Sequence, residues 1–192
     1  MRARFAVSLL LASLLAAAGC GPIIGQVMKA STGVKDFTVV SGSVKDFGAG
    51  GTLLVFAPFK KSEGAYFISR GEDEWLLADG FKNAGLFKTL YAFERDTDAA
   101  AALVVALRAA TSEQAQKLLA LPVAPDAFLT GVLLARDENV APMVGVIEEM
   151  RMRLELTNLT SHKTTSVEIA VKALHKDTIP MLVREIVSRV RG

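Results

Sequence analysis

The stretch from which the fold is predicted is an apolar run that ends in proline: Thr52-Leu53-Leu54-Val55-Phe56-Ala57-Pro58-Phe59. A strand with one face in water alternates apolar and polar residues, whereas this run has no polar residue between Leu53 and Ala57. We therefore expect a strand covered on both faces, which Pro58 ends because proline has no amide to donate to a ladder. The glycines of residues 48–51 precede the strand and indicate a turn rather than a phosphate-binding loop.

A second run of the same kind lies further along the chain: Asp126-Ala127-Phe128-Leu129-Thr130-Gly131-Val132-Leu133-Leu134-Ala135. It too is apolar on both faces, so we expect a second central strand that pairs in parallel with the first. A further strand is expected at residues 86–93, and an edge strand around residues 38–40.

Helix signals stand between and after these strands. Ser69 and Glu72 form a capping box that opens a helix to about Ala84. The acidic residues 72–74 complement the positive end of that helix. Thr111 with Gln114 forms a second box, which splits residues 97–121 into two helices. The expected buried stripe of the first helix is Trp75, Leu77, Phe81 and Ala84.

The last third of the chain predicts a loop, a hairpin and a helix. Residues 136–147 are interpreted as a loop because Pro142 and Gly145 interrupt them. Alternation then indicates a hairpin with one buried face, and residues 179–190 form an amphipathic helix. The loop is rich in apolar side chains, which favour a partner-contact surface or, equally, an extension of the following strand: Val140, Met143, Val144, Val146 and Ile147.

Together these elements predict a single α/β domain over residues 34–192. The expected fold is layered, with a mixed sheet of four to five strands, helices packed on it and a C-terminal amphipathic helix.

The two central strands resemble a known group. A buried strand that ends in Pro58-Phe59, followed much later by Pro125-Asp126-Ala127-Phe128-Leu129-Thr130-Gly131-Val132, is similar to the periplasmic fold shared by the amino-terminal domain of TolB, the curli secretion lipoprotein CsgG and the penicillin-binding-protein activator LpoB. The resemblance implies binding to other envelope proteins and no catalytic constellation. The chain lacks the paired amphipathic strands of the curli pore and the long Pro-rich tether of the activators.

The N-terminus indicates where the domain works. Residues 1–19 have a basic start, an apolar run and the small residues Ala17, Ala18 and Gly19 before Cys20, the only cysteine. This stretch resembles a lipoprotein signal peptide, which implies cleavage before Cys20 and acylation, for example with palmitate. The apolar run is shorter than the roughly 20 residues of a spanning helix. Gly21 implies the outer membrane, on its periplasmic face, and residues 20–33 are expected to be a lipidated tether.

Composition and spacing argue against several classes. Removing residues 1–19 lowers Lys+Arg from 22 to 20, against 20 Asp+Glu, so no basic excess suggests nucleic acid. His162 and His175 lack metal-ligand spacing, and Glu148 and Glu149 point to opposite faces of a strand. No catalytic residue, metal or cofactor is expected.

The function expected from these features is a non-catalytic assembly or accessory factor of an envelope protein complex. Its partners would be the membrane, through the lipid, and other envelope proteins or further copies of itself. The alternative is a carrier or binder of a small apolar ligand or lipid, which would need a cleft beside the sheet.

Overall fold

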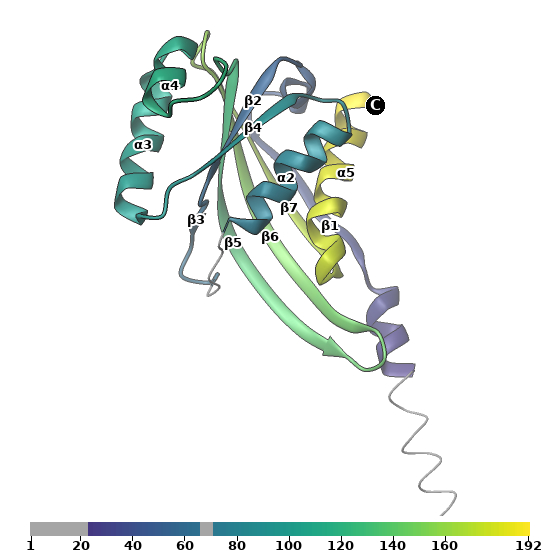
Figure 1. Cartoon of the computed structure of the whole chain (residues 1–192). Coiled ribbons are helices and arrows are strands. Elements are labelled where there is room, and N and C mark those ends of the chain that lie inside the picture. Colours follow the sequence, from purple (N-terminus) through teal and green to yellow (C-terminus); the bar gives the residue numbers. More distant parts are fainter. Residues whose placement is uncertain (1–22, 66–70) are drawn as a thin grey trace, which may run out of the picture.

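The computed structural model describes residues 23–65 and 71–192. Within them the chain is α/β, and one mixed sheet has the strand order β1-β7-β6-β5-β2-β4, with the short β3 paired to β5 (Figure 1). The strands are β1 (Gly33–Ser41), β2 (Thr52–Ala57), β3 (Lys60–Lys61), β4 (Lys88–Phe93), β5 (Ala127–Ala141), β6 (Gly145–Asn158) and β7 (Thr164–Leu174). The helices are α2 (Glu72–Asn83), α3 (Thr97–Ala109), α4 (Ser112–Leu118) and α5 (Thr178–Arg191), with the 3-10 turns η1 (Val44–Gly48) and η2 (His175–Asp177).

The two apolar runs lie side by side, as predicted. β2 pairs in parallel with β5 on one side and with β4 on the other. Leu53 and Val55 face one buried cluster while Leu54 and Phe56 face another, so both faces of β2 are covered. The sheet has seven strands rather than four to five, because edge strand β1 pairs along its length with β7 and two residues after Pro58 add β3.

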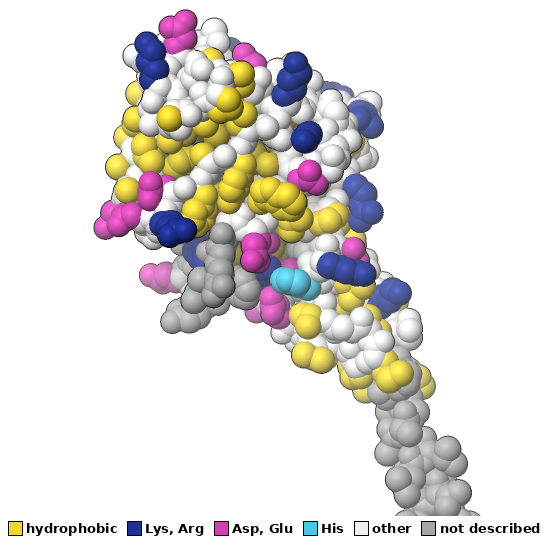
Figure 2. Space-filling model, in the orientation of Figure 1, with side chains coloured by type: hydrophobic (Ala, Val, Ile, Leu, Met, Phe, Trp, Pro, Cys, Tyr) yellow, Lys and Arg dark blue, Asp and Glu magenta, His cyan; other side chains and the backbone are white. Residues whose placement is uncertain are grey.

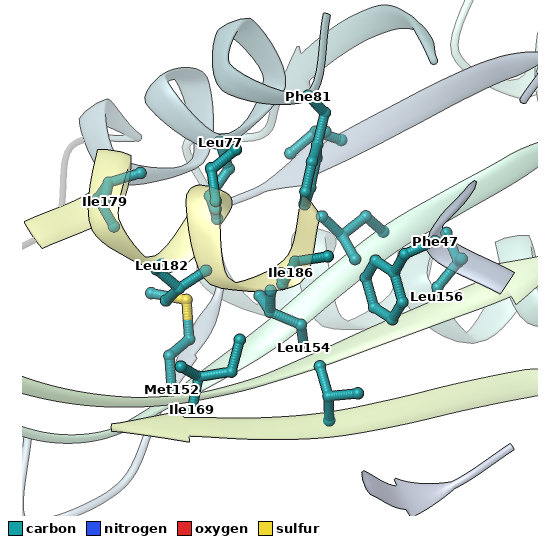
Figure 3. Close-up of a cluster of buried hydrophobic side chains, with 14 of the residues drawn as sticks. Phe47, Leu77, Phe81, Met152, Leu154, Leu156, Ile169, Ile179, Leu182 and Ile186 are labelled. Atoms are coloured by element: carbon teal, nitrogen blue, oxygen red, sulfur yellow. The ribbon is translucent and has the colours of Figure 1, made fainter. Parts of the chain in front are cut away.

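Helices cover the sheet on both faces. On one face α2 and α5 enclose the larger cluster, in which Leu77, Phe81, Leu182 and Ile186 pack on the strand residues (Figure 3). On the other face α3 and α4 pack over Leu54, Phe56 and Phe128 of the central strands. The expected amphipathic helix at the C-terminus is confirmed as α5.

The helix boundaries follow the predicted signals in part. Thr111 and Gln114 make the capping box of α4, and the break before it separates α3 from α4. Ser69 lies outside the described residues, and the N-cap of α2 is Gly71, at φ 87°. Trp75 is 53% exposed, so the buried stripe of α2 is carried by Leu77 and Phe81 without it.

The interpretation of residues 136–147 as a loop is wrong. β5 continues to Ala141 and β6 begins at Gly145, and their ladder runs without interruption from Ala135 to the turn. Pro142 lies in the turn, and Gly145 already pairs with Ala141 as the first residue of β6, so the two strands form a long hairpin. Figure 1 shows that this hairpin extends past α2 and α5.

A helical segment of residues 23–30 packs at the end of this hairpin, within the range expected to be a tether. Gly25 makes the closest approach: a Cβ placed on it would lie 2.1 Å from the Pro142 carbonyl oxygen and 3.0 Å from a Val144 methyl carbon. The predicted signal residues Ala17, Ala18 and Gly19, and Cys20 after them, lie outside the described residues. Within the described part of the chain, no helix combines the length and hydrophobicity needed to span a bilayer.

Candidate functional site

A groove of about 540 Å³ opens beside α3, where β3, the end of β4 and the helix meet. Its lining residues are Pro58, Phe59, Lys60, Lys61, Phe93, Arg95, Thr97, Ala100, Ala101 and Val104. Figure 2 shows hydrophobic side chains gathered on this face of the molecule between α3 and α2. Volumes of roughly 300–1,000 Å³ with apolar walls and a few polar groups are typical of binding sites.

The local sequence explains why the groove is open. The carboxylate of Glu74, buried in α2, accepts a hydrogen bond of 2.7 Å from the amide of Phe59, which holds the chain after β2 in place. Asp96 caps α3 by accepting from the amides of Asp98 and Ala99. Ala100 and Ala101, the alanines of α3 that line the groove, carry too little side chain to fill it.

The polar groups that line the groove are mostly cationic. Lys60, Lys61 and Arg95 supply three positive charges, and the described lining residues include no carboxylate, imidazole or thiol. Partial burial lowers the pKa of Lys61, an effect that the carboxylate of Glu74 opposes. A groove with apolar walls and cations suits an apolar group that carries a negative charge.

Beside the groove the sheet has an open edge. Within residues 23–65 and 71–192, β4 pairs only with β2, so the other side of its backbone offers donors and acceptors. Tyr91 of this strand donates a hydrogen bond of 2.9 Å to the carbonyl of Gly71, and burial raises the pKa of Tyr91 to about 12.

A second candidate site is a buried charge cluster where β5 and β6 leave the body of the domain. A bulge between Leu133 and Ala135 shifts the alternation of β5, so Arg136 turns to the core face opposite Met150. The Arg136 side chain is 3% exposed and contacts the carboxylate of Glu148, and its Nη1 lies 2.8 Å from Asp73 of α2.

Two further groups complete this charge cluster. Glu138 stands directly across from Glu148 in the ladder, and His175 Nδ1 lies 3.2 Å from a Glu148 carboxylate oxygen. Burial raises the pKa of Glu148, against the opposing influence of Arg136. The cluster exploits opposite charge to hold two carboxylates that would otherwise repel each other across the strands.

Glu138, Glu148 and His175 also offer three ligand atoms within 4.8 Å of one another. Carboxylate oxygen and imidazole nitrogen are ligands that suit Zn²⁺. The spacing of the two histidines in the sequence does not predict this set of three ligands. Arg136 already contacts Glu148 and lies 3.8 Å from Glu138, so a metal ion would face a fixed positive charge. We therefore interpret the cluster as an ion network that ties α2 and η2 to the hairpin.

The structure separates the residues predicted as a partner loop. Ile147 is buried at 1% exposure, and Val144 is partly buried. Val140, Met143 and Val146 are exposed at 78%, 89% and 37%. Glu148 and Glu149 point to opposite faces as predicted, since Glu148 is buried and Glu149 is exposed.

Sequence reasoning missed both sites. The groove joins segments about 40 residues apart, and no local motif marks it. The buried charge has a weak signal, because Glu148 stands in phase with the inward residues Met150, Met152 and Leu154, where an apolar residue is expected.

The fold is α/β with a mixed sheet, and a groove opens beside α3. No protein-family model matches the chain, and no curated protein matches it. Among solved structures it is similar to the PelC dodecamer from Paraburkholderia phytofirmans, at 12% identity and a TM-score of 0.46, covering 81% of this chain and 94% of that one. It is also similar to the lipoprotein GNA1162 from Neisseria meningitidis, at 11% identity and a TM-score of 0.40, covering 73% and 98%.

A third similar structure is the hypothetical protein CT253 from Chlamydia trachomatis, at 15% identity and a TM-score of 0.37, covering 74% of this chain and 95% of that one. At these identities and TM-scores the likenesses assign neither a family nor a function to this chain.

Proposed function

We propose that the protein is a lipoprotein, anchored through Cys20 on the periplasmic face of the outer membrane, and that it acts without catalysis as an assembly or accessory factor. In this role its domain binds another envelope protein in the groove beside α3. The observation that supports the proposal is the groove itself, which combines apolar walls, the cations Lys60, Lys61 and Arg95, and a neighbouring open strand edge.

The chemistry of the groove specifies the kind of segment that fits. Extended segments bind to open sheet edges through main-chain hydrogen bonds, and pockets for alternate side chains give specificity. The walls at Phe59, Phe93 and Val104 accept apolar side chains, whereas the three cations favour a segment that carries carboxylates.

Site-specific crosslinking tests this function. A photoreactive phenylalanine analogue at Val104 faces the groove, whereas the same analogue at Val105, which is 69% exposed and does not line the groove, is the matched control. In intact cells we expect discrete covalent adducts from position 104 and none of the same mass from position 105. Adduct mass separates a second copy of this chain from a different protein.

Charge reversal gives the specificity control. Arg95→Glu in the protein that carries the photoreactive analogue at position 104 should remove the adducts, because it replaces a groove cation with a carboxylate. Lys117→Glu, on α4 outside the groove and exposed, should leave them. Adducts that are equal at positions 104 and 105, or insensitive to Arg95→Glu, would contradict binding in the groove.

The size of the groove favours a second candidate function. A single apolar molecule with an anionic head, such as a fatty acid, fits a site of this volume and charge. A fluorescent fatty-acid analogue tests it with the purified mature protein. Saturable binding that Arg95→Glu weakens and Lys117→Glu does not would make the groove a ligand site, whereas no saturable binding leaves the protein-binding function.

A further inference from the structure

The end of the β5–β6 hairpin displays apolar side chains that the fold does not use. Val140 and Met143 are 78% and 89% exposed there. On the adjacent helical segment of residues 23–30, three more are exposed: Ile23 at 65%, Ile24 at 52% and Val27 at 65%. We call these five residues the apolar tip.

The turn at the apolar tip is built to present a large side chain. The amide of Val144 donates to the carbonyl of Ala141, with Pro142 at the second position and Met143 at the third, at φ 63°. That position of the turn favours glycine or asparagine, because a positive φ crowds a Cβ. A methionine here adopts an unfavourable backbone conformation and exposes its side chain almost fully, so the apolar group is not explained by folding.

The two parts of the apolar tip are held together. Gly25 is buried against Pro142 and Val144, and a Cβ at that position would overlap the Pro142 carbonyl. The helical segment therefore lies directly on the turn. Figure 1 shows both at the end of the hairpin, away from α3 and α4.

Chain length ties this end of the molecule to the lipid. Only two residues separate Cys20 from Ile23, and three residues span at most about 10 Å even when fully extended. A lipid on Cys20 thus keeps the start of the helical segment within about 10 Å of the bilayer surface. Apolar side chains held at that distance partition into the boundary between headgroups and acyl chains.

We propose that the apolar tip is a membrane-contact surface that inserts shallowly into the bilayer to which the lipid anchors the chain. The inference rests on the proposed lipid anchor and adds a second, protein-mediated contact. Two contacts at one end of an elongated hairpin orient the domain, whereas a lipid alone leaves it free to tilt.

A depth measurement tests this inference on the mature lipidated protein. Cys20 is the only cysteine and its sulfur carries the lipid, so Met143→Cys introduces the only free thiol for a fluorescent label. Val105→Cys is the matched control, because Val105 is 69% exposed on α3 at the far end of the domain. Both proteins are reconstituted into vesicles of phosphatidylethanolamine and phosphatidylglycerol.

With lipid-borne quenchers at defined depths, we expect the label at position 143 to be quenched and the label at 105 to remain bright. A quencher near the headgroups should act more strongly than one at the chain ends, since insertion of an interfacial element reaches only about 5–10 Å. Aqueous iodide should show the reverse order, with position 105 more accessible.

Other results overturn the inference. The protein could float with the vesicles while iodide quenches the labels at positions 143 and 105 equally. That result would mean that the lipid anchors the protein but the tip does not insert. Protection of position 143 from iodide without quenching from lipid would mean that another protein surface covers the tip. A mature chain that does not float with vesicles would remove the lipid anchor of the proposed function, and the tip contact with it.

Discussion

Gly131 is a residue at which the packing of the sheet excludes any side chain. A Cβ there would lie 2.6 Å from the ring of Phe59 and 2.8 Å from the carbonyl oxygen of Arg153. The backbone oxygen belongs to the neighbouring strand β6 and cannot move alone. The glycine thus lets Phe59 lie against β5 at the base of the groove.

Gly131→Ala should lower the free energy of unfolding by about 1–3 kcal/mol, the usual cost of overpacking a well-filled core. Chemical denaturation measures it. Gly64→Ala is the control, because its Cβ would meet nothing closer than 3.5 Å and should change stability by less than about 0.5 kcal/mol. Equal effects of the two changes would show that the contact with Phe59 is readily relieved.

Glu148 is a residue through which stability should depend on pH in the acidic range. Burial raises its pKa above the ordinary value of 4.5, so the folded protein retains a proton that the unfolded chain releases. Its contribution to stability is therefore fully present below pH 4.5 and is lost as the pH rises through the raised pKa.

Glu148→Gln removes that titration. The melting temperature of the wild type should fall relative to that of Glu148→Gln as the pH is raised from 4.5, measured by thermal denaturation across a pH series. Glu149→Gln alters the exposed neighbour on the other face and should track the wild type. A difference between wild type and Glu148→Gln that stays constant with pH would contradict the raised pKa.

At the scale of elements, β5 serves two purposes along its length. Its first half is buried between two helical layers, with Leu129 wholly inaccessible, and its second half leaves the body of the domain, where Val140 is 78% exposed. The bulge after Leu133 divides the halves and turns Arg136 toward the buried charge cluster.

Shortening single side chains in β5 should show that its two halves contribute differently to stability. Leu129→Ala is expected to cost about 2–5 kcal/mol of unfolding free energy, since it removes a fully buried side chain. Val140→Ala should cost less than about 0.5 kcal/mol, as an exposed position does. Denaturant melts compare the two, and a large loss at Val140 would show that the hairpin end is part of the folded core.

Elements with strong local signals could be predicted from sequence. The apolar runs around Val55 and Leu129 gave the central parallel pair, and Thr111 gave the start of α4. The β5–β6 hairpin could not be predicted, because Pro142 and Gly145 are typical loop residues, although here Pro142 lies in a tight turn and Gly145 is the first residue of β6. The groove could not be predicted either, since it forms where α3, β3 and β4 meet and depends on tertiary packing.

At the scale of the whole molecule, the proposed lipidation of Cys20 would determine where the domain acts. Cys20→Ser should abolish incorporation of a fatty-acid analogue and move the protein out of the membrane fraction, because several acyl chains hold a protein far more firmly than exposed side chains do. Metabolic labelling followed by membrane fractionation measures both effects. Equal labelling of wild type and variant would remove the lipoprotein assignment.

The length of the β5–β6 hairpin has a geometric consequence for any partner. Lys61, which lines the groove, pairs with Leu133, and the turn begins eight residues later at Ala141. At about 3.3 Å per residue, the hairpin places the groove roughly 25 Å from the apolar tip. If the tip contacts the bilayer as proposed, the length of the two strands sets the distance from the membrane at which the groove meets a partner. Lengthening both strands by the same even number of residues would increase that distance and keep every side chain on its present face of the sheet.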